Sequence, residues 1–423
     1  MYALVDCNNF FVSCERIRHP ELQRHPVVVL SNNDGCIVAM SNEVKSLGVS
    51  RGTPFFKVRH LMERHKVAVF SGSHSFYKAC SERVMHALRE LDKMLDIYSV
   101  DEAFLHIPEG TGDLPGYGRY IVEKVWEEAR IPVSVGISHT KTLAKIAARF
   151  AKKYPGYRGA CLIDTDCRRV KALGLTAIED VWGIGRRLSR IMRLSGINTA
   201  LDFASLSREK VRAMLNINGE RTWRELHGEA CLPSSSADHG GKTMLCSRTF
   251  ARDLHSFQEV RQAVMTFAEN VAAKLRRQGV YAKDIEVFLA TNRFHASDAQ
   301  YRNSCVETLP DPSNYTPAIA VAADSALRKI YRAGYGYKRA GVAVKNILPA
   351  AAVQPGLFDD TSVIEKRVSL MRATDAINAL IPRENAVHPA SIGDGLADLV
   401  KSAYHEPGET ADLTSSGGFR TQR

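Results

Sequence analysis

The alternation of apolar and polar positions divides the first 165 residues into strands and helices. Apolar, β-branched runs predict strands in YALVDCNNFF (2–11), which ends in polar residues, and in PVVVLSN (26–32), YSVDEAFLHI (98–107) and IPVSVGIS (131–138). Helical spacing of apolar residues predicts helices over 75–95, 117–130 and 139–153. Residues 36–60 carry turn signals and read as a small mixed subdomain. Strands and helices that alternate around a central strand with two acids indicate a ferredoxin-like α+β sheet.

A second unit of the same kind is predicted after a linker. Residues 166–232 read as short helices, and CLPSSSADHGGK (231–242) is rich in Pro, Ser and Gly, which marks a domain boundary. The pattern then predicts, in order, a strand (243–250), a helix (256–278), two strands (281–291 and 301–309), a helix (316–333) and a strand (338–348). This order is a βαββαβ unit. The small and polar residues after Leu348 predict a partly disordered tail.

The charge is unevenly distributed over the 423 residues, whose net charge is +11. From residue 354 to the end there are 7 Lys/Arg against 10 Asp/Glu, a net of −3, which leaves +14 on the first 353 residues. A basic body indicates a polyanionic partner, although many basic proteins bind no nucleic acid. The length predicts two to four domains.

Several classes of protein do not fit the composition. No apolar run of the sequence approaches the length of a membrane span, and the N-terminus has no basic region or cleavage site typical of a signal peptide. The nine cysteines form no CxxC pair or Cys/His cluster, which argues against structural zinc and a disulfide framework. We therefore expect a cytoplasmic protein that does not associate with membranes.

Two adjacent acids, Asp101 and Glu102, interrupt the strand YSVDEAFL. They fit an exposed strand edge or hairpin, or a cation site. If the first strand lies beside this one, Asp6 ends near both acids, and the three carboxylates repel one another unless a cation neutralises them. Adjacent strand residues point to opposite faces, so these acids converge only at a strand end or a bend. Oxygen ligands without His or Cys favour Mg²⁺ or Mn²⁺, and two ions about 4 Å apart could activate a 3′-hydroxyl.

Two basic segments are candidates for contact with phosphate groups. In HTKTLAKIAARFAKK (139–153), Lys141, Lys145, Arg149 and Lys152 form one stripe, which fits a solvated face and phosphate contact equally well. WGIGRRLSRIMRLSGI (182–197) is similar to a helix-hairpin-helix, whose Gly183-Ile184-Gly185 turn would present backbone N–H groups to a phosphate. A plain helical hairpin is the alternative; the neighbouring arginines favour DNA.

These segments together resemble the Y-family, lesion-bypass DNA polymerases. The resemblance rests on six motifs in order, DCNNFF (6–11), NNDGC (32–36), YSVDEAF (98–104), VSVGISHTKTLAKIAA (133–148), DVWGIGRR (180–187) and QPGLF (354–358). It is strongest to the UmuC branch, the catalytic subunits of bacterial DNA polymerase V and their plasmid-borne relatives. The architecture implied is a multi-domain right hand. Its parts are a palm over 1–165 with fingers inserted at about 18–72, a helical thumb with a helix-hairpin-helix over 166–235, a little finger over 242–350 and a tail over 351–423.

The resemblance also implies roles for individual residues. Two Mg²⁺ ions, replaceable by Mn²⁺, would be held by the catalytic acids Asp6, Asp101 and Glu102 and by the Cys7 carbonyl. Nucleotide-binding residues would be Phe10, Phe11, Asn42, Lys45 and Lys145, with Phe11 as the steric gate against ribose, although Phe10 fits a core position as well. Many family members carry Tyr and Arg where this chain has Asn42 and Lys45, so the phosphate contacts differ. DNA contacts would come from Lys141, Arg149, Gly183, Gly185, Arg186 and Arg187.

The function implied is error-prone translesion synthesis from dNTPs on a primed template in the bacterial SOS response. The short fingers predict low fidelity, because tight closure is one source of selectivity. Gln354, Leu357 and Phe358 match a motif that docks on the β sliding clamp. A cleaved UmuD-like dimer and RecA would be further partners, and the active protein would lie on the nucleoid. The alternatives are a catalytically silent DNA- and clamp-binding protein of the same fold and another palm enzyme such as a nucleotide cyclase.

Overall fold

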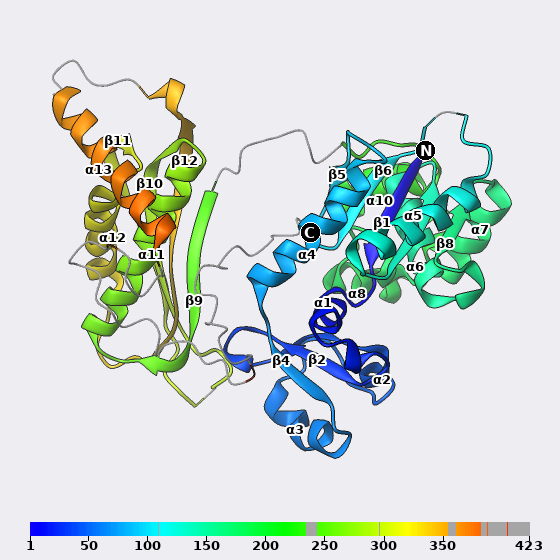
Figure 1. Ribbon diagram of the computed structural model, residues 1–423, viewed down its shortest axis with the longest axis horizontal. Helices are drawn as coiled ribbons and strands as arrows, with labels where there is room; N and C mark the ends of the chain where they lie inside the picture. Colours follow the sequence, from blue (N-terminus) through cyan, green and yellow to red (C-terminus); the bar gives the residue numbers. More distant parts are fainter. Residues whose placement is uncertain are drawn as a thin grey trace. The chain divides into compact units, whose positions relative to one another are not determined.

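The computed structural model describes residues 1–108, 110–233, 243–295, 297–353 and 361–381, together with residues 387 and 404. These residues form two compact units (Figure 1). The first unit holds residues 1–29 and 36–233, and the second holds residues 30–35 and the residues from 243 onward. No helix in these ranges is long and apolar enough to cross a bilayer.

A five-stranded sheet forms the centre of the first unit, in the order β5-β6-β1-β7-β8. Its strands are β1 (Tyr2–Cys7), β5 (Asp96–Ile97), β6 (Glu102–His106), β7 (Val133–Ser138) and β8 (Ala160–Ile163). The alternation of buried side chains gives the sheet two apolar faces. Ala3, Val5 and Ala103 pack on the face toward α4 (His74–Arg89) and α5 (Leu114–Ala129), while Leu4 and Phe104 pack against α6 (Lys141–Lys153).

Small inserted elements and a helical segment complete the first unit. After α1 (Phe10–Arg18), a three-stranded sheet of order β3-β2-β4 combines β2 (Val27–Leu30), β3 (Ile37–Met40) and β4 (Ala68–Ser71) with α2 (Asn42–Lys45) and α3 (Phe55–Arg64). Four helices follow β8 and share a core with α6: α7 (Asp166–Leu175), α8 (Arg186–Leu194), α9 (Ala200–Ala204) and α10 (Arg208–Leu226). The resemblance implies that these two groups are the fingers and the thumb of the right-hand architecture.

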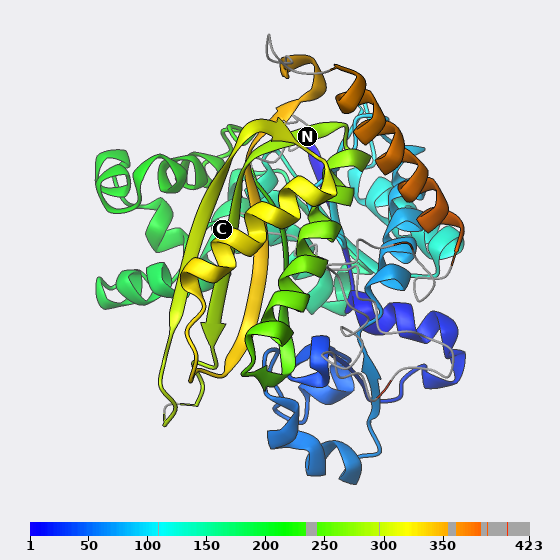
Figure 2. The ribbon, with the colours of Figure 1, turned by 90° about the vertical axis from the view of Figure 1, so that its left-hand side faces the viewer.

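The second unit is a four-stranded antiparallel sheet with two helices on one face, as Figure 2 shows. The order β11-β10-β12-β9 joins β9 (Thr243–Leu254), β10 (Val280–Thr291), β11 (Arg302–Ser313) and β12 (Tyr337–Pro349). The helices are α11 (Phe257–Arg277) and α12 (Thr316–Ile330), and together with the sheet they enclose one apolar core. The predicted βαββαβ order is confirmed.

Three expectations from the sequence need correction. The acidic strand β6 is not central, because β1 lies between β6 and β7; the parallel edge strand β8 was not predicted. The tail, which was expected to be partly disordered, contains a helix that was not predicted, α13 (Thr361–Leu380). Asp375 on α13 pairs with Arg276 of α11, with Oδ2–Nε 2.6 Å, and Met371 is buried, so this helix is anchored to the second unit. The QPGLF segment lies outside the described residues.

A glycine allows α6 to lie unusually close to the sheet. A Cβ atom on Gly136 of β7 would stand 2.0 Å from the backbone nitrogen of Ala148 and 2.1 Å from the carbonyl oxygen of Ala144. Both clashes involve helix backbone, which cannot move aside as a side chain can. The alanines of α6 and the bare backbone of Gly136 therefore fix the separation between this helix and the sheet.

We predict that Gly136→Ala lowers the free energy of unfolding by about 3 kcal/mol or more, because the helix must shift to admit one methyl group. Gly156→Ala is the matched control, since a Cβ there meets no atom within 4 Å, and we expect a change within about 0.5 kcal/mol. Urea denaturation of both variants measures the difference. Equal unfolding midpoints would contradict the close packing of α6.

Candidate active site

The three predicted catalytic acids lie where β1 and β6 meet. Asp6 is opposite Glu102 in the antiparallel register, so both side chains leave the same face of the sheet. Asp101 precedes β6 in a bend, where its backbone carbonyl accepts a hydrogen bond from the Cys7 N–H (2.9 Å) and its Oδ1 accepts one from Ser99 Oγ (2.6 Å). Adjacent residues of a regular strand would point to opposite faces, but Asp101 lies in a bend before β6 and is not bound by that alternation.

Two lysines of α6 neutralise acids of this group. Lys145 Nζ lies 2.7 Å from Glu102 Oε2, and Lys152 Nζ lies 2.7 Å from Asp6 Oδ1. The lysines are seven residues apart, about two helical turns, so they extend from the same side of α6. Sequence reasoning placed Lys152 in the basic stripe but missed it as a site residue; its spacing of seven from Lys145 was the available signal.

The burial of the site shifts the protonation of its groups. Burial raises the pKa of Glu102, Lys145 opposes this rise, and the charges of Asp6 and Asp101 add to it. Burial, followed by the negative charges of Asp101 and Asp6, raises the pKa of the Cys7 thiol well above its usual value. Cys7 therefore offers a hard carbonyl oxygen and no thiolate, and the donor set of three carboxylates and a carbonyl fits Mg²⁺ or Mn²⁺.

Lys45 of the fingers points toward the same charges. Its Nζ donates to Asn9 Oδ1 (2.6 Å) and to Asn42 Oδ1 (3.1 Å), and Asn9 Nδ2 donates to Asn42 Oδ1 (3.2 Å). Burial lowers the pKa of Lys45, and the positive charge of Lys152 lowers it further. The two amides hold this ammonium group beside Lys152, so two cations face one end of the acid cluster. Asn9 was not predicted from the sequence.

The two adjacent phenylalanines have different environments. Phe10 is 4% exposed and belongs to the palm core, so its prediction as a nucleotide contact is replaced by the core position that also fitted it. Phe11 is partly exposed at the start of α1 and stacks on Tyr77 of α4, with ring centroids 4.4 Å apart. Of the pair, only Phe11 has a ring that can meet a nucleotide.

Lys141 has a structural environment that its predicted DNA contact does not fit. Its side chain is buried, and its Nζ lies 2.6 Å from Asp96 Oδ2 and donates to the Pro233 carbonyl (2.9 Å). Lys141 is the first residue of α6 and is buried, so it is not part of a solvent-exposed basic stripe. The ion pair joins two residues of the palm, and the hydrogen bond to Pro233 connects them to the end of the thumb segment, which corrects the assignment of Lys141 to DNA.

A tryptophan joins the predicted helix-hairpin-helix to the acid site. Trp182 Nε1 donates to Tyr98 Oη (3.1 Å), and the Trp182 ring stacks on Phe104 with centroids 5.9 Å apart. The Lys145 ammonium, which pairs with Glu102, lies 4.7 Å from the Tyr98 ring centroid and 5.4 Å from that of Trp182. Sequence reasoning used Trp182 only as part of a motif and did not predict this contact.

The turn that follows Trp182 leads into α8, and a short 3-10 helix (Ile178–Asp180) stands before it. Gly183 has a φ of +89°, a backbone conformation that favours glycine. Gly185 is the N-cap residue of α8. Arg186 and Arg187 at the start of α8 are exposed. Arg149 of α6 is also more than half exposed, although it pairs with Asp180.

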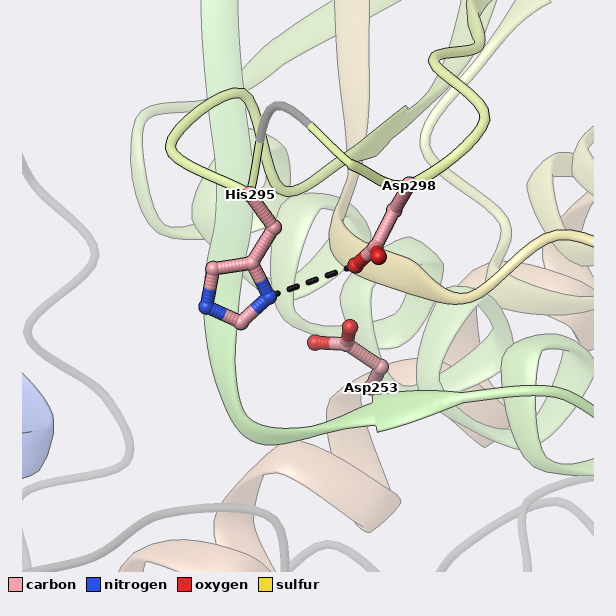
Figure 3. A group of neighbouring side chains, drawn as sticks. All are labelled: Asp253, His295 and Asp298. Atoms are coloured by element: carbon pink, nitrogen blue, oxygen red, sulfur yellow. Dashed lines mark ion pairs between the residues drawn. The ribbon is translucent and has the colours of Figure 1, made fainter.

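A separate group of ligand-type side chains lies in the second unit. The ligand atoms of Asp253, His295 and Asp298 are within 4.8 Å of one another, and Figure 3 shows the ion pair between His295 Nδ1 and Asp298 Oδ2 (3.3 Å). Asp253 is also 3.5 Å from Lys338 Nζ, which competes with a cation there. The palm acids are less closely grouped, and each has a different partner: Asp6 pairs with Lys152, Glu102 pairs with Lys145, and Asp101 accepts a hydrogen bond from Ser99.

Comparison with known proteins identifies the family of the chain. Residues 5–149 match the impB/mucB/samB family, and residues 241–357 match the C-terminal domain of that family. Protein UmuC of Salmonella typhimurium strain LT2 is 39% identical over 382 residues, which cover 90% of each chain. Protein ImpB of Salmonella typhimurium is 37% identical over 389 residues, 89% of this chain and 90% of that protein.

More distant relatives align with most of the chain. DNA polymerase IV of Desulfatibacillum aliphaticivorans is 26% identical over 383 residues, 88% of this chain and 92% of that protein. The solved structure of a Y-family DNA polymerase chimera, Dbh-Dpo4(243-245)-Dbh, aligns with a TM-score of 0.66 at 20% identity and covers 82% of this chain and 99% of its own. The chain therefore belongs to the impB/mucB/samB family, the UmuC branch of the Y-family DNA polymerases.

Proposed function

We propose that the chain is an error-prone, DNA-directed DNA polymerase that extends a primer past damaged template bases in the bacterial SOS response. One observation carries the proposal: Asp6 and Glu102 face each other across β1 and β6, with Asp101 in the adjoining bend, and lysines of α6 approach this acidic group. Three acids at a strand junction suit phosphoryl transfer, whose catalysis is mostly positioning and charge stabilisation.

The acids and the Cys7 carbonyl fit a pair of divalent ions, which we propose to be Mg²⁺. Bound there, the ions would neutralise phosphate charge and lower the pKa of the primer 3′-hydroxyl. Y-family polymerases as a class depend on metal. Asp6 and Glu102 supply carboxylates from neighbouring strands, and the hydrogen bonds of Asp101 to Ser99 and Cys7 hold the bend in place.

The lysines around the acids have separate proposed roles. Lys45 and Lys152 lie together beside Asp6, so we assign them to the triphosphate of the incoming dNTP, with Asn42 orienting Lys45. Lys145 lies deeper, between Glu102 and the aromatic rings of Tyr98 and Trp182. We assign it to holding the Glu102 carboxylate, which replaces its predicted contact with the triphosphate.

Primed DNA is the proposed macromolecular substrate. The exposed Arg186 and Arg187, the Gly183–Gly185 turn and Arg149 lie on or beside the thumb and suit sequence-independent phosphate contact. A catalytically silent DNA-binding protein is disfavoured, because it gains nothing from grouping partly buried acids at considerable desolvation cost.

The remaining partners follow from the family resemblance. We propose that the β sliding clamp binds Gln354, Leu357 and Phe358, and that a cleaved UmuD-like dimer and RecA complete the active assembly. The surfaces that meet the last two partners are not assigned. This function places the protein in the bacterial cytoplasm, on the nucleoid when it is active.

We predict that Asp101→Asn lowers primer extension by about a thousandfold or more, because one carboxylate of the catalytic group becomes neutral. The measurement is extension of a primed template by the full chain with dNTPs and Mg²⁺, and with its partners if they are required. Asp298→Asn is the control, since that acid belongs to the separate group in the second unit, and its extension should be unchanged. Equal extension by Asp101→Asn and the parent protein would refute the assignment.

We predict that Phe11→Ala raises the use of ribonucleotides relative to deoxynucleotides by about tenfold or more, because the ring no longer meets the 2′-hydroxyl. Single-nucleotide incorporation with dNTP and rNTP substrates gives the two values of kcat/KM. Phe11→Tyr keeps the ring and should keep the discrimination. If Phe11→Ala discriminates as well as the parent does, the steric gate is another residue.

A further inference from the structure

A second layer of side chains lies directly behind the Phe11 ring. Phe11 and Glu15 are four residues apart on α1, so they are neighbours on one side of that helix. Tyr77 of α4 contacts both: its ring stacks on Phe11 with centroids 4.4 Å apart and planes inclined by 18°, and its hydroxyl donates to Glu15 Oε1. Tyr77 therefore spans one turn of α1 and touches it at two points.

The packing leaves these groups little room. Tyr77 is 1% exposed and Glu15 is 3% exposed, and the edge of the His74 ring also meets Phe11, with centroids 5.9 Å apart and planes at 83°. Phe11 is thus contacted on a face by Tyr77 and approached edge-to-face by His74, two favourable geometries for aromatic pairs. The ring that meets the sugar is supported from the core side.

The hydrogen bond between Tyr77 and Glu15 indicates that this pair does more than fill the core. A carboxylate inside a core is costly to desolvate, and an apolar pair of similar volume would pack there without that cost. A hydrogen bond to a carboxylate is strong and directional, so it fixes the position of the hydroxyl end of the Tyr77 side chain, which a purely apolar contact does not. The position of the Tyr77 ring in turn limits how far the Phe11 ring stacked on it can move.

We propose that Tyr77 and Glu15 are positioning residues for sugar selection: they hold the Phe11 ring rigid so that it blocks a ribose 2′-hydroxyl. The inference rests on the proposed role of Phe11 as the steric gate. A gate discriminates only as well as its ring resists displacement, because a shift of about 1 Å relieves the clash with one oxygen atom. Neither residue touches the substrate, so both act through Phe11.

The test compares kcat/KM for a dNTP with that for the matching rNTP in Tyr77→Phe, Glu15→Gln and the double variant of the full chain. Tyr77→Phe keeps the stacked ring and loses only the hydroxyl, and we expect the dNTP preference to fall by about threefold to tenfold. Glu15→Gln should lower it to a similar or smaller extent. The double variant should resemble Tyr77→Phe, since Tyr77→Phe removes the hydrogen bond that Glu15→Gln only weakens.

A matched control separates positioning from general weakening of the core. Val84 is equally buried and lies two turns farther along α4, so Val84→Ala should lower stability and leave the preference for dNTP unchanged. A structural role alone would lower both kcat/KM values in parallel. An unchanged ratio in Tyr77→Phe and Glu15→Gln, while Phe11→Ala loses discrimination, overturns the positioning role and leaves the gate intact. Retained discrimination in Phe11→Ala refutes the gate and, with it, this proposal.

Discussion

The close contact of α6 with β7 at Gly136 determines where the charges of the active site lie. Because Gly136 has no side chain, the backbone of α6 at Ala144 and Ala148 packs directly against the backbone of β7. From this position, Lys145 reaches Glu102 and Lys152 reaches Asp6, each at 2.7 Å. A larger separation would lengthen the reach that both lysine side chains must span, so packing in the core contributes to the electrostatics at the surface of the palm.

The site is also connected to the thumb through aromatic contacts. Trp182 precedes the Gly183–Gly185 turn and contacts Tyr98 and Phe104, which flank the acids in the sequence. Lys145 lies beside two of these rings and binds Glu102. The Lys141 ammonium, which pairs with Asp96, donates to the carbonyl of Pro233 at the other end of the thumb segment. The palm and thumb of this chain therefore meet along the first two turns of α6, at Lys141 and Lys145.

The sequence predicted the elements of the fold better than the environment of single side chains. The second unit follows the predicted order because its strands alternate clearly and its helices are long and periodic. The short parallel strand β8 was missed, as was α13, whose apolar residues follow no clear stripe. Lys141 looked like an exposed stripe residue, since periodicity identifies a helix face but not which neighbours cover it. The bend that brings Asp101 to Asp6 and Glu102 was predicted only as a requirement, and Asn9, Tyr77 and Glu15 depend on contacts between distant segments.

Lysines of α6 neutralise two of the carboxylates that we propose to bind divalent ions, so lysine and metal would compete. The most direct measurement is the affinity of the full chain for Mn²⁺, by electron paramagnetic resonance without DNA or nucleotide, in Lys152→Ala and in Lys153→Ala. Lys153 is the adjacent exposed lysine, which lies over the Tyr154 ring and away from Asp6. We expect Lys152→Ala to bind Mn²⁺ about threefold to tenfold more tightly than the parent protein, and Lys153→Ala to bind it with unchanged affinity. Equal affinities in the two variants would contradict it.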